Sequence, residues 1–244
     1  MIQVEKGENQ LLKLVKQFST KAELVYHSLV DAIIENRLTP GTRLIVKDIA
    51  EQLSVSDIPV REALIMLEST GLIETKVHVG SVVATPSPEW IEEVFVMRAA
   101  LESMAIRTAI PFMTEADIGE IIALEASMKK VAQQGDAVGY PHLNRKFHKA
   151  VMSKCPYPNL LSMIDDLLVK SQYGRAIFGL KPATVKTSDL EHDQLIEAIR
   201  NRDSNRAELI TRDHRLRVGT ELADAIRKLL IKKDTIEEVN EKNI

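Results

Sequence analysis

The stretch Val-Ser-Asp-Ile-Pro-Val-Arg-Glu-Ala-Leu at residues 55–64 decides the fold of the N-terminal part of the chain. Its apolar residues, among them Val60 and Leu64, recur every three or four positions, which is the spacing of the buried face of a helix. Ser56 precedes this pattern and predicts the N-cap of the helix. Arg61 lies off the apolar face, so we expect its side chain to point toward solvent.

Two further helices are predicted on the N-terminal side of this one. Apolar residues return with helical spacing between Leu24 and Ile34, and Pro40-Gly41 then forces a turn. Residues 46–53 place their apolar side chains on one face of a helix of two turns. A tight turn therefore separates this short helix from the helix that follows Ser56, as in helix-turn-helix proteins.

A β-hairpin is predicted directly after these helices. Leu72–Thr75 and Ser81–Ala84 are short β-favouring runs, and Gly80 lies in the loop between them. Three helices followed by a hairpin is the order of a winged helix-turn-helix. The segment Thr85-Pro86-Ser87-Pro88 then interrupts the chain and predicts a domain boundary.

The rest of the chain is predicted to be helical, because no strand pattern competes there. About six helices are expected, and they begin near Glu89, Glu115, Ala137, Asn159, Thr184 and Ser204. The fold class is therefore mainly α, with an N-terminal winged helix-turn-helix and a C-terminal all-α helical bundle. The expected parts are an N-terminal arm at 1–20, the winged helix-turn-helix at 21–86, the helical domain at 87–232 and a charged, frayed tail at 233–244.

Composition limits the class of protein. The chain has 244 residues, 45% of them hydrophobic, which is enough for two domains with cores of their own. It has no apolar run long enough to cross a bilayer, so a cytoplasmic protein with no membrane partner is expected. The single cysteine, Cys155, excludes an internal disulfide and a multi-cysteine zinc site.

The charge balance does not by itself favour nucleic-acid binding. The formal net charge is −3, and the first 86 residues carry nine basic against eleven acidic side chains. DNA-binding domains usually show a basic excess, because neutralising phosphates supplies much of their affinity. A DNA-binding function must therefore rest on the local sequence around residues 55–64.

Three of the six histidines lie on apolar faces of three different predicted helices: His148, His192 and His214. Imidazoles that converge from separate helices form metal sites in helical bundles, although a lone inward histidine is more often a packed core residue. Asn144 lies one turn before His148, so its side-chain oxygen is a candidate fourth ligand. Three nitrogens and one oxygen suit zinc, nickel or manganese with coordination positions left open.

An arginine lies on the buried face of the first helix of the helical domain. Arg98 shares that face with apolar residues, and a buried guanidinium needs an anion. Two alternatives stay open: an internal pair with Glu102, or a clamp for a carboxylate effector. Ser171 and Arg175, on a later helix, are weaker candidates for the same effector pocket.

Residues 55–64 resemble the recognition helix of the GntR family of bacterial regulators, whose pattern is V-S-x-x-P-V-R-E-A-L and whose eight fixed positions are all present. The resemblance implies that Ser56 and Arg61 contact DNA, and that Lys47 stands at a basic position of the preceding helix. It also implies that Gly80 lets the wing approach the DNA backbone. The family usually has arginine where this chain has Asp57, which predicts a different operator or a lower affinity.

The helical part looks like the FadR-like branch of that family, which carries an FCD-type effector domain. There one acidic residue and three histidines hold a divalent metal, and the matching positions are Asn144, His148, His192 and His214. The branch usually has aspartate at the position of Asn144, and a neutral amide is a weaker ligand. The resemblance also implies a carboxylate metabolite as effector.

These observations together predict a homodimeric transcription regulator, most simply a repressor. Its expected partners are a double-stranded DNA operator, a small carboxylate effector and a second copy of the chain. A regulator with a metal-free effector pocket is the alternative that Asn144 keeps open. A metal-dependent hydrolase is disfavoured because no glutamate follows a histidine as in H-E-x-x-H, and Glu191 is expected to point away from the face of His192.

Overall fold

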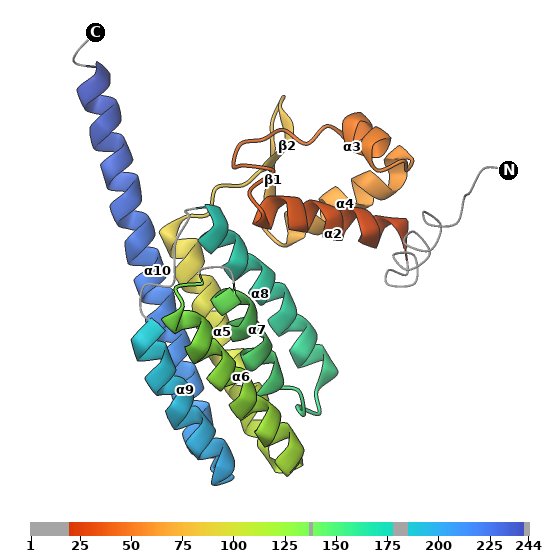
Figure 1. Ribbon diagram of the computed structural model, residues 1–244. Helices are drawn as coiled ribbons and strands as arrows, with labels where there is room; N and C mark the ends of the chain where they lie inside the picture. The colour runs from red at the N-terminus through yellow and green to blue at the C-terminus, as the bar shows by residue number, and fades with distance from the viewer. Residues whose placement is uncertain (1–19, 137–138, 178–184, 242–244) are drawn as a thin grey trace, which may run out of the picture. The chain divides into compact units, whose positions relative to one another are not determined.

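The computed structural model describes residues 20–136, 139–177 and 185–241, and the chain divides into two compact units between Thr85 and Pro86 (Figure 1). The sequence places this boundary one residue later. The predicted N-terminal arm lies outside the described residues, apart from Thr20.

The first unit contains the predicted helices and hairpin: α2 (Lys21–Ile34), α3 (Val46–Gln52), α4 (Asp57–Ser69), β1 (Ile73–Lys76) and β2 (Gly80–Val83). Thr20 begins α2 with a capping box, because its hydroxyl accepts from the amide of Glu23 while the Glu23 carboxylate accepts from the amide of Thr20. Ser56 is the N-cap residue of α4, but its side chain makes no capping hydrogen bond. The order of elements is that of a winged helix-turn-helix, as the sequence predicts.

The wing is a two-stranded antiparallel hairpin in which Ile73 is opposite Val83 and Lys76 is opposite Gly80. Arg43 adds an isolated bridge to Val82. Gly80 begins β2 with φ of +93°, a backbone conformation that side chains with a Cβ rarely adopt. The glycine is therefore required where the hairpin closes.

The second unit contains six α-helices in the described residues, and each begins within two residues of its predicted start. They are α5 (Pro88–Ala109), α6 (Glu115–Gln133), α7 (Gly139–Ala150), α8 (Pro158–Ile177), α9 (Val185–Arg200) and α10 (Ser204–Glu241), with a short 3-10 turn at Ile110–Phe112. The predicted fold class, a winged helix-turn-helix followed by an all-α bundle, is confirmed. None of the helices in the described ranges combines the length and the apolar character that crossing a bilayer requires.

The helices α5 and α10 lie side by side and run in opposite directions (Figure 1). They approach closely at Gly219, where an added Cβ would lie 2.4 Å from the Cβ of Phe95. Phe95 packs there with Ile91, Leu222 and Ile226. A larger apolar cluster, contributed by α5 to α10, fills the rest of the unit and surrounds the histidines.

The predicted frayed tail at 233–244 is wrong for most of its length, because α10 continues as a helix to Glu241. The reason is visible in the sequence: neither glycine nor proline follows Gly219, so no residue type interrupts the helix.

Candidate functional site

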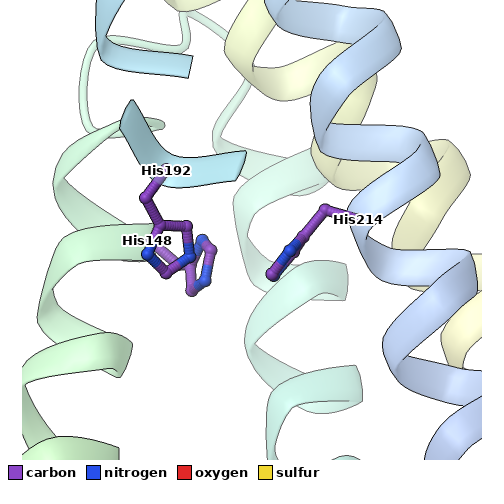
Figure 2. A group of neighbouring side chains, drawn as sticks. All are labelled: His148, His192 and His214. Atoms are coloured by element: carbon purple, nitrogen blue, oxygen red, sulfur yellow. The ribbon is translucent and has the colours of Figure 1, made fainter. Parts of the chain in front are cut away.

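The structure brings His148, His192 and His214 together from α7, α9 and α10. Their ring centroids are separated by 5.1, 5.4 and 5.2 Å, so the three imidazoles form a nearly equilateral triangle. Figure 2 shows the rings pointing toward one another. All three side chains are buried, and each offers a nitrogen within 4.8 Å of the others.

Two of these imidazoles have a buried nitrogen with no hydrogen-bond partner among the residues that the structure describes. The atoms are Nε2 of His148 and Nε2 of His192. A buried nitrogen lone pair without a donor or a metal is costly, since it has given up its hydrogen bond to water. The triangle is therefore suited to a cation that accepts these lone pairs.

A buried carboxylate fixes the orientation of His192. Its Nδ1 lies 3.1 Å from Oε2 of Glu125 on α6. A carboxylate only accepts hydrogen bonds, so Nδ1 carries the proton and Nε2 keeps its lone pair. Carboxylate, histidine and metal form this same chain in many metal sites, where the carboxylate holds the ring and raises its basicity.

A second carboxylate does the same for His214. Nδ1 of His214 donates to Glu191, which also accepts hydrogen bonds from Nε and Nη2 of Arg217. Burial alone would raise the pKa of Glu191, but the hydrogen bonds from His214 and Arg217 outweigh it and lower that pKa to about 2. Glu191 is therefore an anion at neutral pH and keeps Nε2 of His214 unprotonated.

Two of the three histidines, His148 and His214, are held in the neutral form. Burial lowers the pKa of His214 to about 3, against the hydrogen bond to Glu191, which raises it. Burial also lowers the pKa of His148 well below its ordinary value, and the positive charges of Arg215 and Arg98 lower it further. A metal ion therefore need not displace a proton from either ring at neutral pH.

A small cavity of about 10 Å³ adjoins the triangle, enough for a single ion or water molecule. Its lining adds polar and apolar side chains from α9 and α10: Glu191, Leu195, Ile210 and Thr211. The hydroxyl of Thr211 is buried and has no hydrogen-bond partner in the described part of the chain. Thr211 is thus a polar group available to a bound oxygen ligand.

Asn144 lies one turn before His148 on α7 and is half-buried, whereas the three histidines are buried. Two acidic side chains bond to the triangle: Glu125 and Glu191, at the outer nitrogens of His192 and His214. Asp189 of α9 also lies within 4.8 Å of Glu125 and His192. The negative charge around the site therefore comes from α6 and α9 rather than from the helix of Asn144.

Arg98 adopts the internal-pair alternative. Its Nε donates to Oε1 of Glu102 at 2.7 Å, and its Nη1 donates to the hydroxyl of Ser171 at 2.9 Å. Nε of Arg215 donates to the other oxygen of Glu102 at 2.7 Å. Burial alone would raise the pKa of Glu102, but the two guanidinium groups outweigh it and hold that pKa below its ordinary value.

The structure describes the side chain of only one of the two weaker effector candidates, Ser171 and Arg175. Ser171 is buried in α8 and is part of the Arg98 network. Arg175 is in the helical part of α8, but its side chain lies outside the described residues.

The side chains expected at the DNA are on the surface of the first unit. Lys47, Ser56 and Arg61 are exposed, on α3, at the N-cap of α4 and in its second turn. Asp57 is half-buried in the first turn of α4, where a negative charge is favourable to the helix. Gly80 is exposed on the wing.

Sequence reasoning missed four polar residues of the helical unit. Glu125 lies on the buried stripe of α6 with Ile121 and Met128, which is the same signal that identified Arg98. Glu191 was expected to point away from His192, and it does so, toward His214 instead, because one helical residue corresponds to a rotation of about 100°. Thr211 and Arg215 gave no signal, since their partners are on other helices.

Comparison with known proteins agrees with both units. The family model for bacterial regulatory proteins of the gntR family matches residues 21–83, and the FCD domain model matches residues 93–217. The HTH-type transcriptional regulator McbR of Escherichia coli (strain K12) is 30% identical over 168 residues, which are 68% of this chain and 76% of McbR. A probable D-xylose utilization operon transcriptional repressor of Paenarthrobacter nicotinovorans is 28% identical over 193 residues, 78% of this chain and 83% of that one.

Among solved structures, E. coli McbR/YncC superimposes with a TM-score of 0.65 and 25% sequence identity, over 88% of this chain and 98% of that chain. The resemblance drawn from residues 55–64 and from the helical part is confirmed by these matches. The chain therefore belongs to the gntR family of bacterial regulatory proteins, carries an FCD domain, and is a DNA-binding transcriptional regulator rather than an enzyme.

Proposed function

We propose that this regulator is a homodimeric repressor whose operator affinity is set by a small carboxylate metabolite, bound at or near a divalent metal ion that His148, His192 and His214 hold. The observation that carries the proposal is the pair of buried Nε2 atoms in the histidine triangle that have no hydrogen-bond partner within residues 20–136, 139–177 and 185–241. Glu125 and Glu191 leave the inner nitrogens as lone-pair donors, which is the tautomer a metal requires.

Zinc, nickel and manganese suit this donor set, with Asn144 as the candidate fourth ligand. When bound, the metal supplies a positive charge with open positions for oxygen ligands. Glu125 and Glu191 orient the rings, and the apolar residues around the cavity exclude water. The half-buried amide of Asn144 adds no charge, so an anionic ligand is the natural complement of the cation.

A carboxylate effector is supported by the charges near the triangle. Burial is the main cause of the lowered pKa of His148, and the guanidinium groups of Arg215 and Arg98 lower it further, so their positive field reaches the imidazole. The same field favours an anion at the metal, and the unpartnered hydroxyl of Thr211 is a hydrogen-bond donor for it. The cavity accommodates about one water molecule, so effector binding has to open it. Opening is a structural change that can be transmitted to DNA.

The Paenarthrobacter relative is a probable transcriptional repressor of a D-xylose utilization operon, which supports repression of a metabolic operon by this chain. The proposed dimer places two α4 helices on the half-sites of a palindrome. Effector binding weakens operator binding only if the effector prefers one arrangement of the two DNA-binding heads.

Elemental analysis of the purified, untagged protein tests the metal site. We expect stoichiometric zinc, nickel or manganese in the wild type and its loss in His192→Ala and in His214→Ala. His142→Ala is the matched control, because His142 is exposed on the same helix as His148 and outside the triangle. A wild type that is folded and metal-free, also after incubation with each metal, contradicts the metal site and supports the metal-free effector pocket.

A further inference from the structure

Helix α5 carries an apolar stripe on its solvent side. Val96 is 56% exposed and Met104 is 46% exposed, and Ala100 is exposed between them. These three residues follow one another at four-residue spacing, so they form a continuous line along the helix. Met97 widens the line on one side. Apolar surface of this kind, arranged in a row rather than scattered, marks an interaction site.

Helix α10 extends this apolar surface on its other side. Leu209 and Leu216 are both exposed. Arg107, which lies on the exposed stripe of α5, pairs with Glu208, the neighbour of Leu209. Because the two helices are antiparallel, Leu216 lies about level with Ala100. The surface, here called the α5 face, consists of Val96, Met97, Ala100, Met104, Leu209 and Leu216.

The sequence of the stripe is complementary to itself in the antiparallel direction. Reversing α5 about Ala100 places Val96 opposite Met104, four residues to either side. It also places the exposed Glu93 opposite Arg107, seven residues to either side. Seven residues correspond to about two helical turns, so both charges return to the same side as the apolar line. Ala100, at the centre, is small enough for two helices to approach closely.

We propose that the α5 face is the surface on which a second copy of this chain docks, with α5 of each copy antiparallel and the two-fold axis passing at Ala100. An isologous interface requires that the same patch complement itself under a two-fold rotation. The α5 face meets this requirement in apolar character and in charge, whereas an unrelated partner would not need Glu93 and Arg107 at equal distances from Ala100.

This inference rests on the proposed function in one respect, the homodimer, and it is independent of the metal and of the effector. It lies within the helical unit, so it makes no demand on how the DNA-binding unit is placed. It assigns the dimer contact to a helix that also carries Arg98 and Glu102 on its buried face. A change at the effector site would then reach the dimer contact through one helix.

Cysteine cross-linking of the full chain tests the position of the axis. The only native cysteine, Cys155, is buried, so a new surface cysteine gives an unambiguous signal. Ala100→Cys is expected to form a covalent dimer under mild oxidation, because residues on a two-fold axis bring their Cβ atoms within disulfide range. Ala123→Cys, exposed on α6, is the control and is expected to stay uncross-linked.

Charge reversal tests the self-complementarity. Each of Glu93→Arg and Arg107→Glu is expected to raise the dimer dissociation constant at least about tenfold, since each change places like charges opposite each other twice. The double variant restores the opposite-charge pairing across the axis and is expected to recover most of the affinity. Arg107→Glu also removes the pair with Glu208, so recovery in the double variant is the diagnostic result.

Analytical ultracentrifugation of wild type and Met104→Glu distinguishes a failure of the α5 face from a failure of the proposed dimer. Met104 is exposed, so the variant is expected to keep its far-UV circular dichroism while becoming a monomer. A variant that is as dimeric as the wild type overturns the α5 face but leaves the proposed dimer intact. A wild type that is monomeric at micromolar concentration overturns both, without any consequence for the metal content measured above.

Discussion

Asn144 is the residue at which this chain departs from the metal-binding pattern of the branch it resembles. Its amide is neutral, and it lies one turn before His148 on α7. Asn144→Asp is expected to tighten divalent-metal binding by at least about tenfold, because a carboxylate adds charge to a site of neutral imidazoles. Competition with a chelator of known affinity measures the change.

A control variant separates ligation from a general charge effect. Asn201→Asp adds the same charge at an exposed position in the turn before α10, and it should leave the metal affinity unchanged. Equal affinities for Asn144→Asp and wild type would place Asn144 outside the coordination sphere, with the histidines as the only protein ligands.

The neutral imidazole of His214 also affects how the stability of the metal-free protein depends on pH. Burial lowers the pKa of His214 to about 3, so the folded chain leaves this ring unprotonated where the unfolded chain protonates it. Between pH about 3 and 6.5 the unfolded state binds more protons, and stability therefore falls as pH falls. His214 alone is expected to contribute a loss of about 2 kcal/mol between pH 6.5 and 5.

Denaturant unfolding of chelator-treated protein at these two pH values measures the loss. His214→Gln is expected to reduce the pH dependence, and His142→Gln, changed at an exposed position of α7, is expected to keep it. A wild type with equal stability at both pH values would mean that His214 is protonated in the folded chain.

At the scale of elements, the close approach of α5 and α10 depends on a glycine. A Cβ at Gly219 would lie 2.4 Å from the Cβ of Phe95, an atom fixed to its own backbone, so the helices have to move apart. Gly219→Ala is expected to lower the free energy of unfolding by about 1–3 kcal/mol despite the higher helix propensity of alanine. Thermal and denaturant unfolding of the full chain measure it.

Gly119→Ala on α6 is the matched control, because its added Cβ meets no atom within 4 Å. There only the backbone effect remains, and stability is expected to rise by about 0.5–1 kcal/mol. If both variants were more stable than the wild type, α5 and α10 would have to lie farther apart at Gly219 than the 2.4 Å distance to the Cβ of Phe95 implies.

The elements were predictable because their signals are local. Helical spacing, Pro40-Gly41 and the prolines between the later helices are properties of neighbouring residues, and the helix starts follow from them. The convergence of three histidines was also predictable as a possibility, since each lies on a buried face. The partners of those histidines were not, because Glu125 and Glu191 contact rings on other helices. Which carboxylate contacts which histidine is determined by the packing of the helices against one another.

At the scale of the whole molecule, regulation requires that effector binding to one unit changes the affinity of the other unit for DNA. The DNA-binding side chains lie in the unit before Thr85 and the histidine triangle lies in the unit after it. If an effector weakens operator binding by some factor, the operator weakens effector binding by the same factor. In the proposed dimer the two units can be coupled, since two half-sites bind together only at one spacing of the DNA-binding heads.

The charge of the whole chain bears on how tightly it binds DNA. The net charge is −3, and Asp57 places a carboxylate at the start of α4 where the family usually has arginine. Asp57→Arg is expected to strengthen binding to random duplex DNA and to steepen its salt dependence by about one unit of log–log slope per subunit, because each new phosphate contact releases about one counterion. Fluorescence anisotropy over a series of salt concentrations measures both effects.

A second charge-reversal variant distinguishes a local contact with DNA from an effect of the overall charge. Glu120→Arg changes the net charge by the same amount, but Glu120 is exposed on α6 in the helical unit. Long-range attraction alone would make the two variants alike, with a similar small gain that disappears at physiological salt, where charges more than about 8 Å apart are screened. A gain confined to Asp57→Arg, together with the steeper salt slope, would place the first turn of α4 against the phosphates. An unchanged slope in Asp57→Arg would show that α4 approaches DNA by another part of its surface.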